Sequence, residues 1–175
     1  MKNLILLSLV CLFTLSVKSQ NTASSIDGFN NSQWGASETE VRNNISSRNV
    51  NIQKRGNDLI ILNYSYLEIE DCNISWQFNS KGELVRGLVL AVPSSSSKAL
   101  QKYALIERQL ELKYGQGKRS DFHAMCYRDS SINWKRTLKR GEDILSTQWS
   151  DSEGNTITML MSTKLQIQVL FQSNG

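Results

Sequence analysis

The chain has 175 residues, of which 39% are hydrophobic and 21% are charged, which is the usage of an ordinary globular protein. This composition excludes extended disorder, a collagen-like repeat, a coiled coil and a multi-span membrane protein. One histidine and three cysteines leave little material for a metal site, and no motif indicates a cofactor. After removal of a short N-terminal segment, the length corresponds to one domain.

The first residues have the organisation of an export signal. Lys2 precedes an apolar run over residues 4–17, which suits a signal peptide and is too short to span a bilayer. Ser19 suits a cleavage site, so residues 1–19 are predicted to be a signal peptide, followed by a flexible lead-in over 20–28. We therefore expect an exported protein, periplasmic or secreted, without a transmembrane segment after cleavage.

The remaining chain begins with the pattern of one helix and three strands. Ser37 and Glu40 have the spacing of a capping box, which predicts a helix that starts there and ends near Arg48. Apolar and polar residues alternate strictly around Trp76, which is typical of a strand with one buried face. The three predicted strands cover residues 59–67, 72–78 and 83–92.

The second half of the chain repeats this order. Ser97 is the predicted N-cap of a helix over 98–114, whose apolar stripe includes Tyr103 and Leu110, and Gly115 suits the position after its end. The other predicted elements are an irregular segment over 116–130, a short helix over 131–140, and strands over 144–150, 155–162 and 165–173.

A helix followed by three strands, occurring twice, predicts an α+β fold. We expect a single domain over 29–175 that consists of two tandem helix-plus-three-strand units, about 29–93 and 94–175. Together the strands would form an antiparallel sheet with the helices packed on one face.

The other face of such a sheet would be open to solvent or to a partner. Residues 88–92 are apolar at successive positions, which indicates either a strand buried on both sides or an apolar sheet face that binds a protein. The polar residues expected to point outward are Gln77, Asn79, Gln166 and Gln168.

Two cysteines, Cys72 and Cys126, remain after signal cleavage. An oxidising compartment permits a disulfide between them, and the alternative is two separate buried thiols. His123 lies near Cys126, but the surrounding residues do not resemble a nucleophile signature. Paired carboxylates occur only at strand ends and turns, and there is no phosphate-binding glycine-rich loop. The sequence therefore predicts a protein that is not an enzyme.

The densest basic cluster is Lys135, Arg136, Lys139 and Arg140, which would share one face of a helix. Such a face could meet an anionic membrane surface, an acidic partner or a nucleic acid, and the alternative is an ordinary solvated surface. Without the signal peptide the chain has 18 basic and 16 acidic residues, a surplus too small to indicate a nucleic-acid partner.

Three short motifs occur in a recognisable order. They are Trp34-Gly35-x-Ser37-x-x-Glu40-Val41, a helix end Leu110-Glu111-Leu112-Lys113-Tyr114-Gly115, and Trp149 followed by Ile157-x-Met159. This order resembles exported Bacteroidetes-type bacterial proteins of unknown function, which carry a WGxSxxEV helix start and an LxxKYG helix end. The architecture is also similar to the helix-plus-sheet repeats of β-lactamase-inhibitor-like proteins and, more loosely, of the lipoprotein BamE, although a lipidated cysteine is lacking here.

These observations favour a non-enzymatic domain that binds another macromolecule, most simply an envelope or secreted protein. The architectural resemblance implies an inhibitor or immunity-type protein as a specific form of this function. The alternative is a carrier of a small ligand or lipid, with a pocket between the sheet and the helices.

Overall fold

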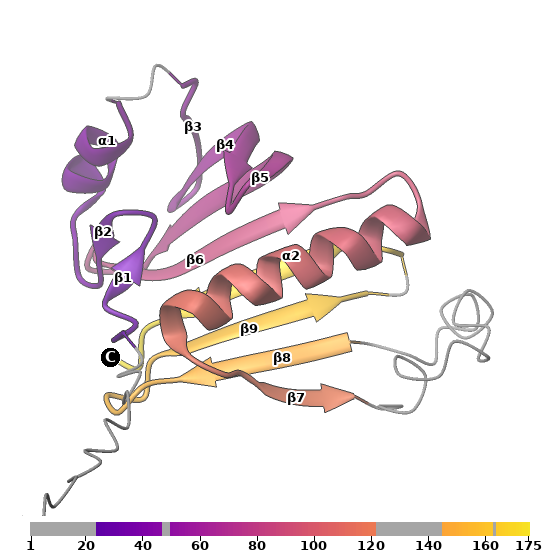
Figure 1. The fold of residues 1–175 in the computed structure, drawn as a ribbon. Coiled ribbons are helices and arrows are strands. Elements are labelled where there is room, and N and C mark those ends of the chain that lie inside the picture. The colour runs from indigo at the N-terminus through magenta and orange to yellow at the C-terminus, as the bar shows by residue number, and fades with distance from the viewer. Residues whose placement is uncertain (1–23, 47–49, 122–144, 163) are drawn as a thin grey trace, which may run out of the picture.

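The computed structural model describes residues 24–46, 50–121, 145–162 and 164–175. This part of the chain forms an antiparallel pair, two helices and a sheet of eight strands (Figure 1). The pair is β1 (Gly28–Phe29) and β2 (Ser32–Gln33), and the helices are α1 (Glu38–Ser46) and α2 (Ser96–Tyr114). The sheet contains β3 (Gln53–Arg55), β4 (Asp58–Tyr66), β5 (Ile69–Phe78), β6 (Leu84–Ala91), β7 (Lys118–Asp121), β8 (Leu145–Ser150), β9 (Thr156–Met161) and β10 (Ile167–Gln172).

The large sheet has the strand order β3-β4-β5-β6-β10-β9-β8-β7, and all neighbours are antiparallel. The α+β class and the antiparallel sheet are confirmed. The two central strands, β6 and β10, come from different halves of the sequence, and they are paired over their lengths from Ile167 opposite Ala91 to Gln172 opposite Arg86.

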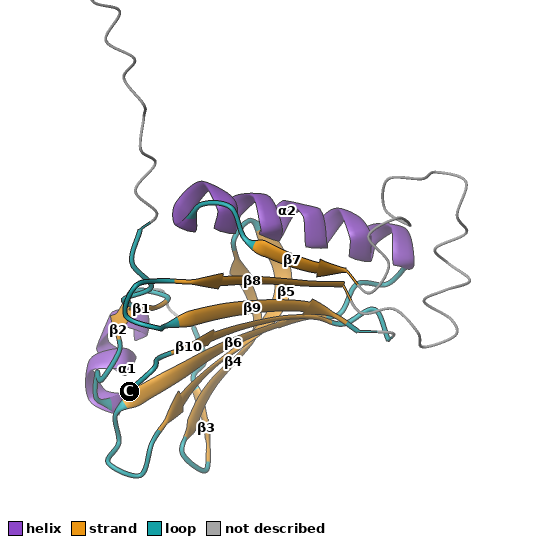
Figure 2. Ribbon diagram, turned by 90° about the horizontal axis from the view of Figure 1, so that it is seen from below, coloured by secondary structure: helices purple, strands orange, loops and turns teal. Residues whose placement is uncertain are grey.

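One face of the sheet carries the core. In β5, β6, β9 and β10 buried and less buried residues alternate. Helix α2 lies over one side of the sheet (Figure 2), and its buried residues share one apolar cluster with the buried residues of these strands. Tyr103, Ile106 and Leu110 of α2 and Val41 and Ile45 of α1 belong to the same apolar cluster. Burial on one side follows from the period-2 alternation of the strands.

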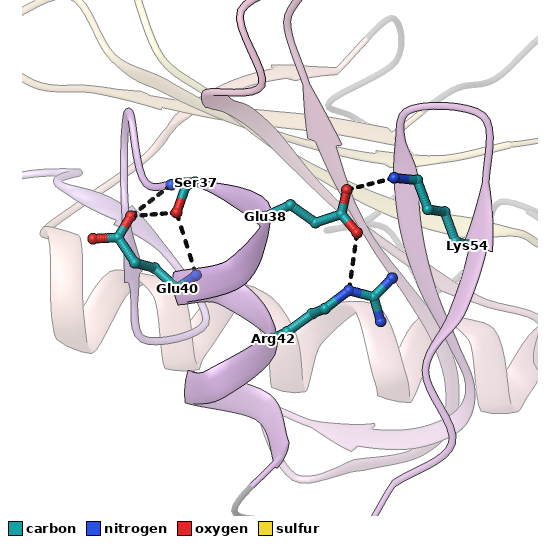
Figure 3. A network of polar contacts seen from close by, with 5 residues as sticks. All are labelled: Ser37, Glu38, Glu40, Arg42 and Lys54. Carbon is teal, nitrogen blue, oxygen red and sulfur yellow. Dashed lines mark hydrogen bonds and ion pairs between the residues drawn. The ribbon is translucent and has the colours of Figure 1, made fainter.

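Helix α1 begins as its sequence predicts. The Ser37 N–H and hydroxyl both donate to Glu40 Oε2 at 2.7 Å, and the Glu40 N–H donates to Ser37 Oγ at 3.3 Å (Figure 3). The hydrogen bond from the Ser37 N–H lowers the pKa of Glu40. Glu38 accepts from Lys54 at 2.6 Å and from Arg42 at 2.9 Å, and these bonds lower its pKa and connect α1 to β3.

Helix α2 starts two residues earlier than the sequence predicts. Ser95, not Ser97, is the N-cap: its backbone is extended, with φ −152°, and its hydroxyl accepts from the Lys98 N–H at 3.3 Å. In a run of serines, the backbone conformation decides which hydroxyl caps the helix. The predicted end is confirmed, because Gly115 has φ 79° and its N–H donates to the Glu111 carbonyl at 2.9 Å.

Residues 116–130 were expected to be irregular, and this is wrong for 118–121, which form the edge strand β7. The short edge strands β3 and β7 escaped prediction because neither contains an apolar alternation. The signal peptide and the short helix over 131–140 lie outside the described residues.

The segment over 20–28 was expected to be a flexible lead-in, but its described part is fixed to the domain. Ile26 is buried, its N–H donates to Asp151 Oδ2 at 2.8 Å, and its carbonyl accepts from Trp34 Nε1 at 2.6 Å. Asp151 also accepts from the backbone N–H groups of Glu153 and Asn155. Burial alone would raise the pKa of Asp151, but the hydrogen bonds from Ile26 and Asn155 hold it below its usual value.

Phe29 places the β1–β2 pair on the middle of the sheet. A Cβ added to Gly87 would lie 2.0 Å from Cγ of Phe29, so the ring occupies the space above this glycine. Gly87 is paired with Trp76 on one side and with Phe171 on the other. The ring centroid of Phe29 lies 5.6 Å from that of Trp76 and 5.0 Å from that of Phe171, so the Phe29 ring fills the gap between these two rings.

Asp151→Asn tests the attachment of the N-terminal segment. Because a lowered pKa stabilises the fold above the ordinary carboxyl pKa and loses this effect as the pH falls through the folded value, the variant should be less stable by about 1–2 kcal/mol at pH 7, with a difference that shrinks below pH ~4. Urea unfolding across this pH range measures it. Asp27→Asn, an exposed neighbour of Ile26, is the control, and a pH-independent difference for Asp151→Asn would contradict the assignment.

Gly87→Ala tests the contact with Phe29. The added methyl group overlaps the ring, so we expect a loss of about 1–3 kcal/mol or more in the free energy of unfolding. In a Phe29→Ala background the same change should be neutral or stabilising, since alanine in a strand is favoured over glycine by about 0.5–1 kcal/mol. Urea unfolding of the four variants gives the coupling, and additive effects would exclude the proposed packing.

Candidate functional site on the open face of the sheet

The open face is the side of the sheet opposite α2. Its residues follow from the strand register, because each lies next to a buried residue of the same strand. Leu88 of β6 is opposite Leu170 of β10, and Leu170 is opposite Thr158 of β9. One step along the strands, Gln168 of β10 lies between Leu90 of β6 and Leu160 of β9.

Four leucines therefore surround Gln168 on the central strands. This leucine patch consists of Leu88, Leu90, Leu160 and Leu170, all of which are half-buried, while their neighbours Val89, Val169 and Met159 are at most 2% exposed. Within residues 24–46, 50–121, 145–162 and 164–175, no helix covers the patch.

The surroundings of the leucine patch are polar and mostly uncharged. Ser75 and Asn73 of β5 flank it on one side, and Ser146 and Gln148 of β8 flank it on the other. The charged residues lie further out. Asp58 and Arg86 are on either side of Gln77 in one row, and Lys118 is on edge strand β7. An apolar centre without charges inside a polar rim is the composition of a protein–protein interface.

Of the four residues predicted to point outward, two lie on the open face and two do not. Gln77 and Gln168 lie on the open face, as expected. Asn79 is instead part of the turn between β5 and β6, where its Oδ1 accepts from the Glu83 N–H at 3.0 Å. Gln166 precedes β10, and its N–H donates to Ser162 Oγ at 3.3 Å. Both were misplaced because alternation does not show where a strand ends.

Residues 88–92 were interpreted either as buried or as an apolar sheet face, and each interpretation holds for some of these residues. Val89 and Ala91 are buried, whereas Leu88 and Leu90 belong to the open face, and Val92, beyond the strand, is 59% exposed. The contributions of Leu160 and Leu170 were missed. Their positions between buried Met159 and Met161, and between buried Val169 and Phe171, carried the signal that could have identified them.

The other candidate residues do not form a site within the described chain. Cys72 is buried, and this raises the pKa of its thiol, while its predicted disulfide partner Cys126 lies outside the described residues, so the bridge stays a prediction. His123 and the basic face of Lys135, Arg136, Lys139 and Arg140 also lie outside them. Within the described ranges, no cluster of three potential metal ligands occurs.

A buried polar network joins α2 to the sheet. The Tyr103 hydroxyl lies 3.0 Å from Thr147 Oγ1, which donates to Glu107 Oε1 at 2.7 Å. Arg119 Nη2 lies 3.5 Å from the other oxygen of Glu107. This chain of contacts runs from helix to strand beneath α2, where it fixes the helix on β7 and β8, and we therefore assign it a structural role.

The motifs that carry the sequence resemblance also act structurally. Trp34 Nε1 donates to the Ile26 carbonyl, and Trp149 Nε1 donates to the Gly115 carbonyl at 2.9 Å. Two of the motifs, the helix end at Gly115 and Trp149, are thus connected by a single hydrogen bond, which joins the end of α2 to β8.

No protein-family model matches the chain, and no curated protein matches it. Among the described residues, neither helix has the length and apolar character needed to cross a bilayer. The function therefore has to be argued from the surface of the fold.

Neighbouring residues on β6 and β10 test the two-faced sheet. Val89→Ala and Val169→Ala remove buried carbon atoms and should each cost about 2 kcal/mol or more. Leu88→Ala and Leu170→Ala remove larger but half-buried groups and should each cost less than about 1 kcal/mol. Urea unfolding at neutral pH compares the four variants, and equal costs on both faces would show that the leucine patch is covered.

Proposed function

We propose that this chain is an exported, non-enzymatic binding module of the bacterial envelope whose open sheet face binds another protein. The observation that carries the proposal is the leucine patch, which lies on the central strands, has uncharged polar neighbours and has no described helix over it. Partly exposed leucines at the centre of a rigid surface are favourable contacts for a partner, because burying them completely adds apolar area to the interface.

The open face has the size that such a function requires. Eight strands at about 4.8 Å spacing give a width of about 34 Å, and three rows of outward residues give a height of about 15–20 Å. The resulting area of about 500–700 Å² is close to the roughly 800 Å² that each partner contributes to a standard interface. Adjacent loops supply the difference.

The proposal includes the tandem arrangement of two units. The strand order supports it, because α1 followed by β3–β6 and α2 followed by β7–β10 occupy the sheet in mirrored order on either side of the β6–β10 pair. Each unit then has a helix and four strands, with short β3 and β7 added to the expected three. Leu88 and Leu170 face each other across the seam.

An inhibitor or immunity-type role is the specific form of this proposal. It is supported by the architectural resemblance to β-lactamase-inhibitor-like proteins and by a sheet surface with an uncharged centre, which needs little reorganisation to bind. The partner would then be a secreted or envelope protein. Exported localisation rests on the predicted signal peptide over 1–19.

Capture of the partner tests the proposal. The tagged full chain is expressed in its own cells and isolated, and proteins recovered with it are quantified by mass spectrometry. The double variant Leu88→Ser/Leu170→Ser should reduce recovery of a near-stoichiometric partner by at least about tenfold, since loss of central apolar contacts costs more than about 1.4 kcal/mol.

Leu112→Ser is the matched control, because Leu112 is an exposed leucine of α2, 73% accessible and remote from the open face. Equal recovery of the partner by the face variant and the control would assign binding to another surface. Recovery of the bait alone with the unaltered chain would contradict the proposal as a whole.

A further inference from the structure

A hollow lies at one end of the open face, beside the leucine patch. It has a volume of about 480 Å³, and four of its lining residues form one continuous row across β4, β5, β6 and β10. In that row the strand register places Asp58 opposite Gln77, Gln77 opposite Arg86, and Arg86 opposite Gln172. Arg86 precedes Leu88 by two residues on β6, so the hollow continues the surface that is proposed to bind a protein.

The guanidinium group of Arg86 is not engaged by the described part of the chain. Arg86 is exposed, and within the described residues its side chain forms neither a hydrogen bond nor an ion pair. Asp58 does not neutralise it, because Gln77 lies between them and donates from Nε2 to Asp58 Oδ2 at 3.3 Å. Two strand spacings, about 10 Å, separate the two charged residues. A guanidinium with free donors suits a carboxylate, whose two oxygens accept two of its N–H groups side by side.

Cations predominate in the two rows of the open face that contain Arg86 and Leu88. The row of Arg86 begins on β3 with Arg55, which is opposite Asp58, and the row of Leu88 ends on β7 with Lys118. The other described members of both rows are uncharged, so the two rows contain three cations and one carboxylate. A partner that complements this surface therefore carries an excess of acidic groups.

The spacing of these cations indicates separate acidic side chains rather than a polyanion. Three strand spacings place Arg55 about 14 Å from Arg86, and four place Lys118 at least about 19 Å from Arg86. A nucleic acid presents its phosphates without such gaps. A second copy of the open face would present the same excess of cations, and like charges brought together oppose association. The arrangement is therefore best complemented by a different protein with a few acidic residues in its interface.

We propose that the partner bound by the open face presents a carboxylate that enters this hollow and pairs with Arg86, next to an apolar side chain that covers Leu88. The inference rests on the proposed function and specifies the chemistry of its partner. Arg86 and Leu88 lie on one face of β6, so the acidic and apolar groups of the partner would be about 7 Å apart. An arginine beside an apolar centre is a frequent hot spot of binding, because the surrounding contacts exclude water from it.

Charge reversal at Arg86 tests the inference when the partner is captured from the protein's own cells with the tagged full chain. Arg86→Glu should reduce recovery of the near-stoichiometric partner by at least about tenfold, because two carboxylates would then meet. Arg108→Glu is the matched control, since Arg108 is an exposed arginine of α2, and it should leave recovery unchanged. Both positions are exposed, so the thermal unfolding of both variants should match that of the unaltered chain.

A zero-length cross-link identifies the carboxylate of the partner directly. Arg86→Lys keeps the positive charge and supplies a primary amine, which a carbodiimide condenses with a neighbouring carboxylate to form an amide. Peptide mapping by mass spectrometry should find the amine introduced at position 86 joined to an aspartate or glutamate of the partner. Arg108→Lys, which introduces the same amine on α2, should give no such product.

The outcomes separate this inference from the proposed function. Equal recovery by Arg86→Glu and Arg108→Glu would overturn the inference, as would cross-links to the partner that all avoid position 86, while loss of recovery in Leu88→Ser/Leu170→Ser would still support the proposed function. Sedimentation of the unaltered chain with phosphatidylglycerol vesicles, abolished by Arg86→Glu, would also overturn the inference, because the anion would be a lipid phosphate. Recovery of no partner by the unaltered chain would contradict both.

Discussion

The seating of Phe29 above Gly87 is the contact on which the rest of the domain depends. Gly87 interrupts a row of large side chains that runs across the sheet through Trp76, Phe171 and Ile157. The ring of an N-terminal residue fills the interruption, so the segment before α1 becomes part of the core rather than a tail. Residue 29 and the middle of β6 are far apart in the sequence, so this contact closes a long loop of the chain.

That closure gives the two sides of the domain different properties. On the core side, residues of α1, α2 and the β1–β2 pair join the buried residues of the sheet in one apolar cluster. On the other side nothing described is packed, and the outward rows keep the composition that their strands give them. The difference between the packed face and the open face thus arises from one asymmetry, the placement of both described helices on one side.

Local signals predicted the elements, and long-range contacts decided their details. The capping box at Ser37 and the stop at Gly115 depend on a few neighbouring residues and were predicted correctly. The open face could be predicted only in part. The alternation around Trp76 shows which residues of a strand share a face, but it does not show which strands are neighbours in the sheet. The pairing of Leu88 with Leu170 comes from the β6–β10 seam, and the placement of the β1–β2 pair comes from the contact of Phe29 with Gly87. Neither leaves a local pattern in the sequence.

The separation of buried and outward residues along each central strand allows the proposed binding face to exist without weakening the fold. Val89 and Val169 are buried on one side, while Leu88 and Leu170 are half-buried on the other, where fewer packing contacts constrain them. A β-strand makes this possible because successive side chains point to opposite faces, so selection for binding and selection for packing act on alternate residues. In α2 the same separation is less complete: Tyr103 and Glu107 belong both to its packed surface and to the network that fixes it on β8. The sheet, rather than the helix, is accordingly the part of this domain best able to acquire a new partner.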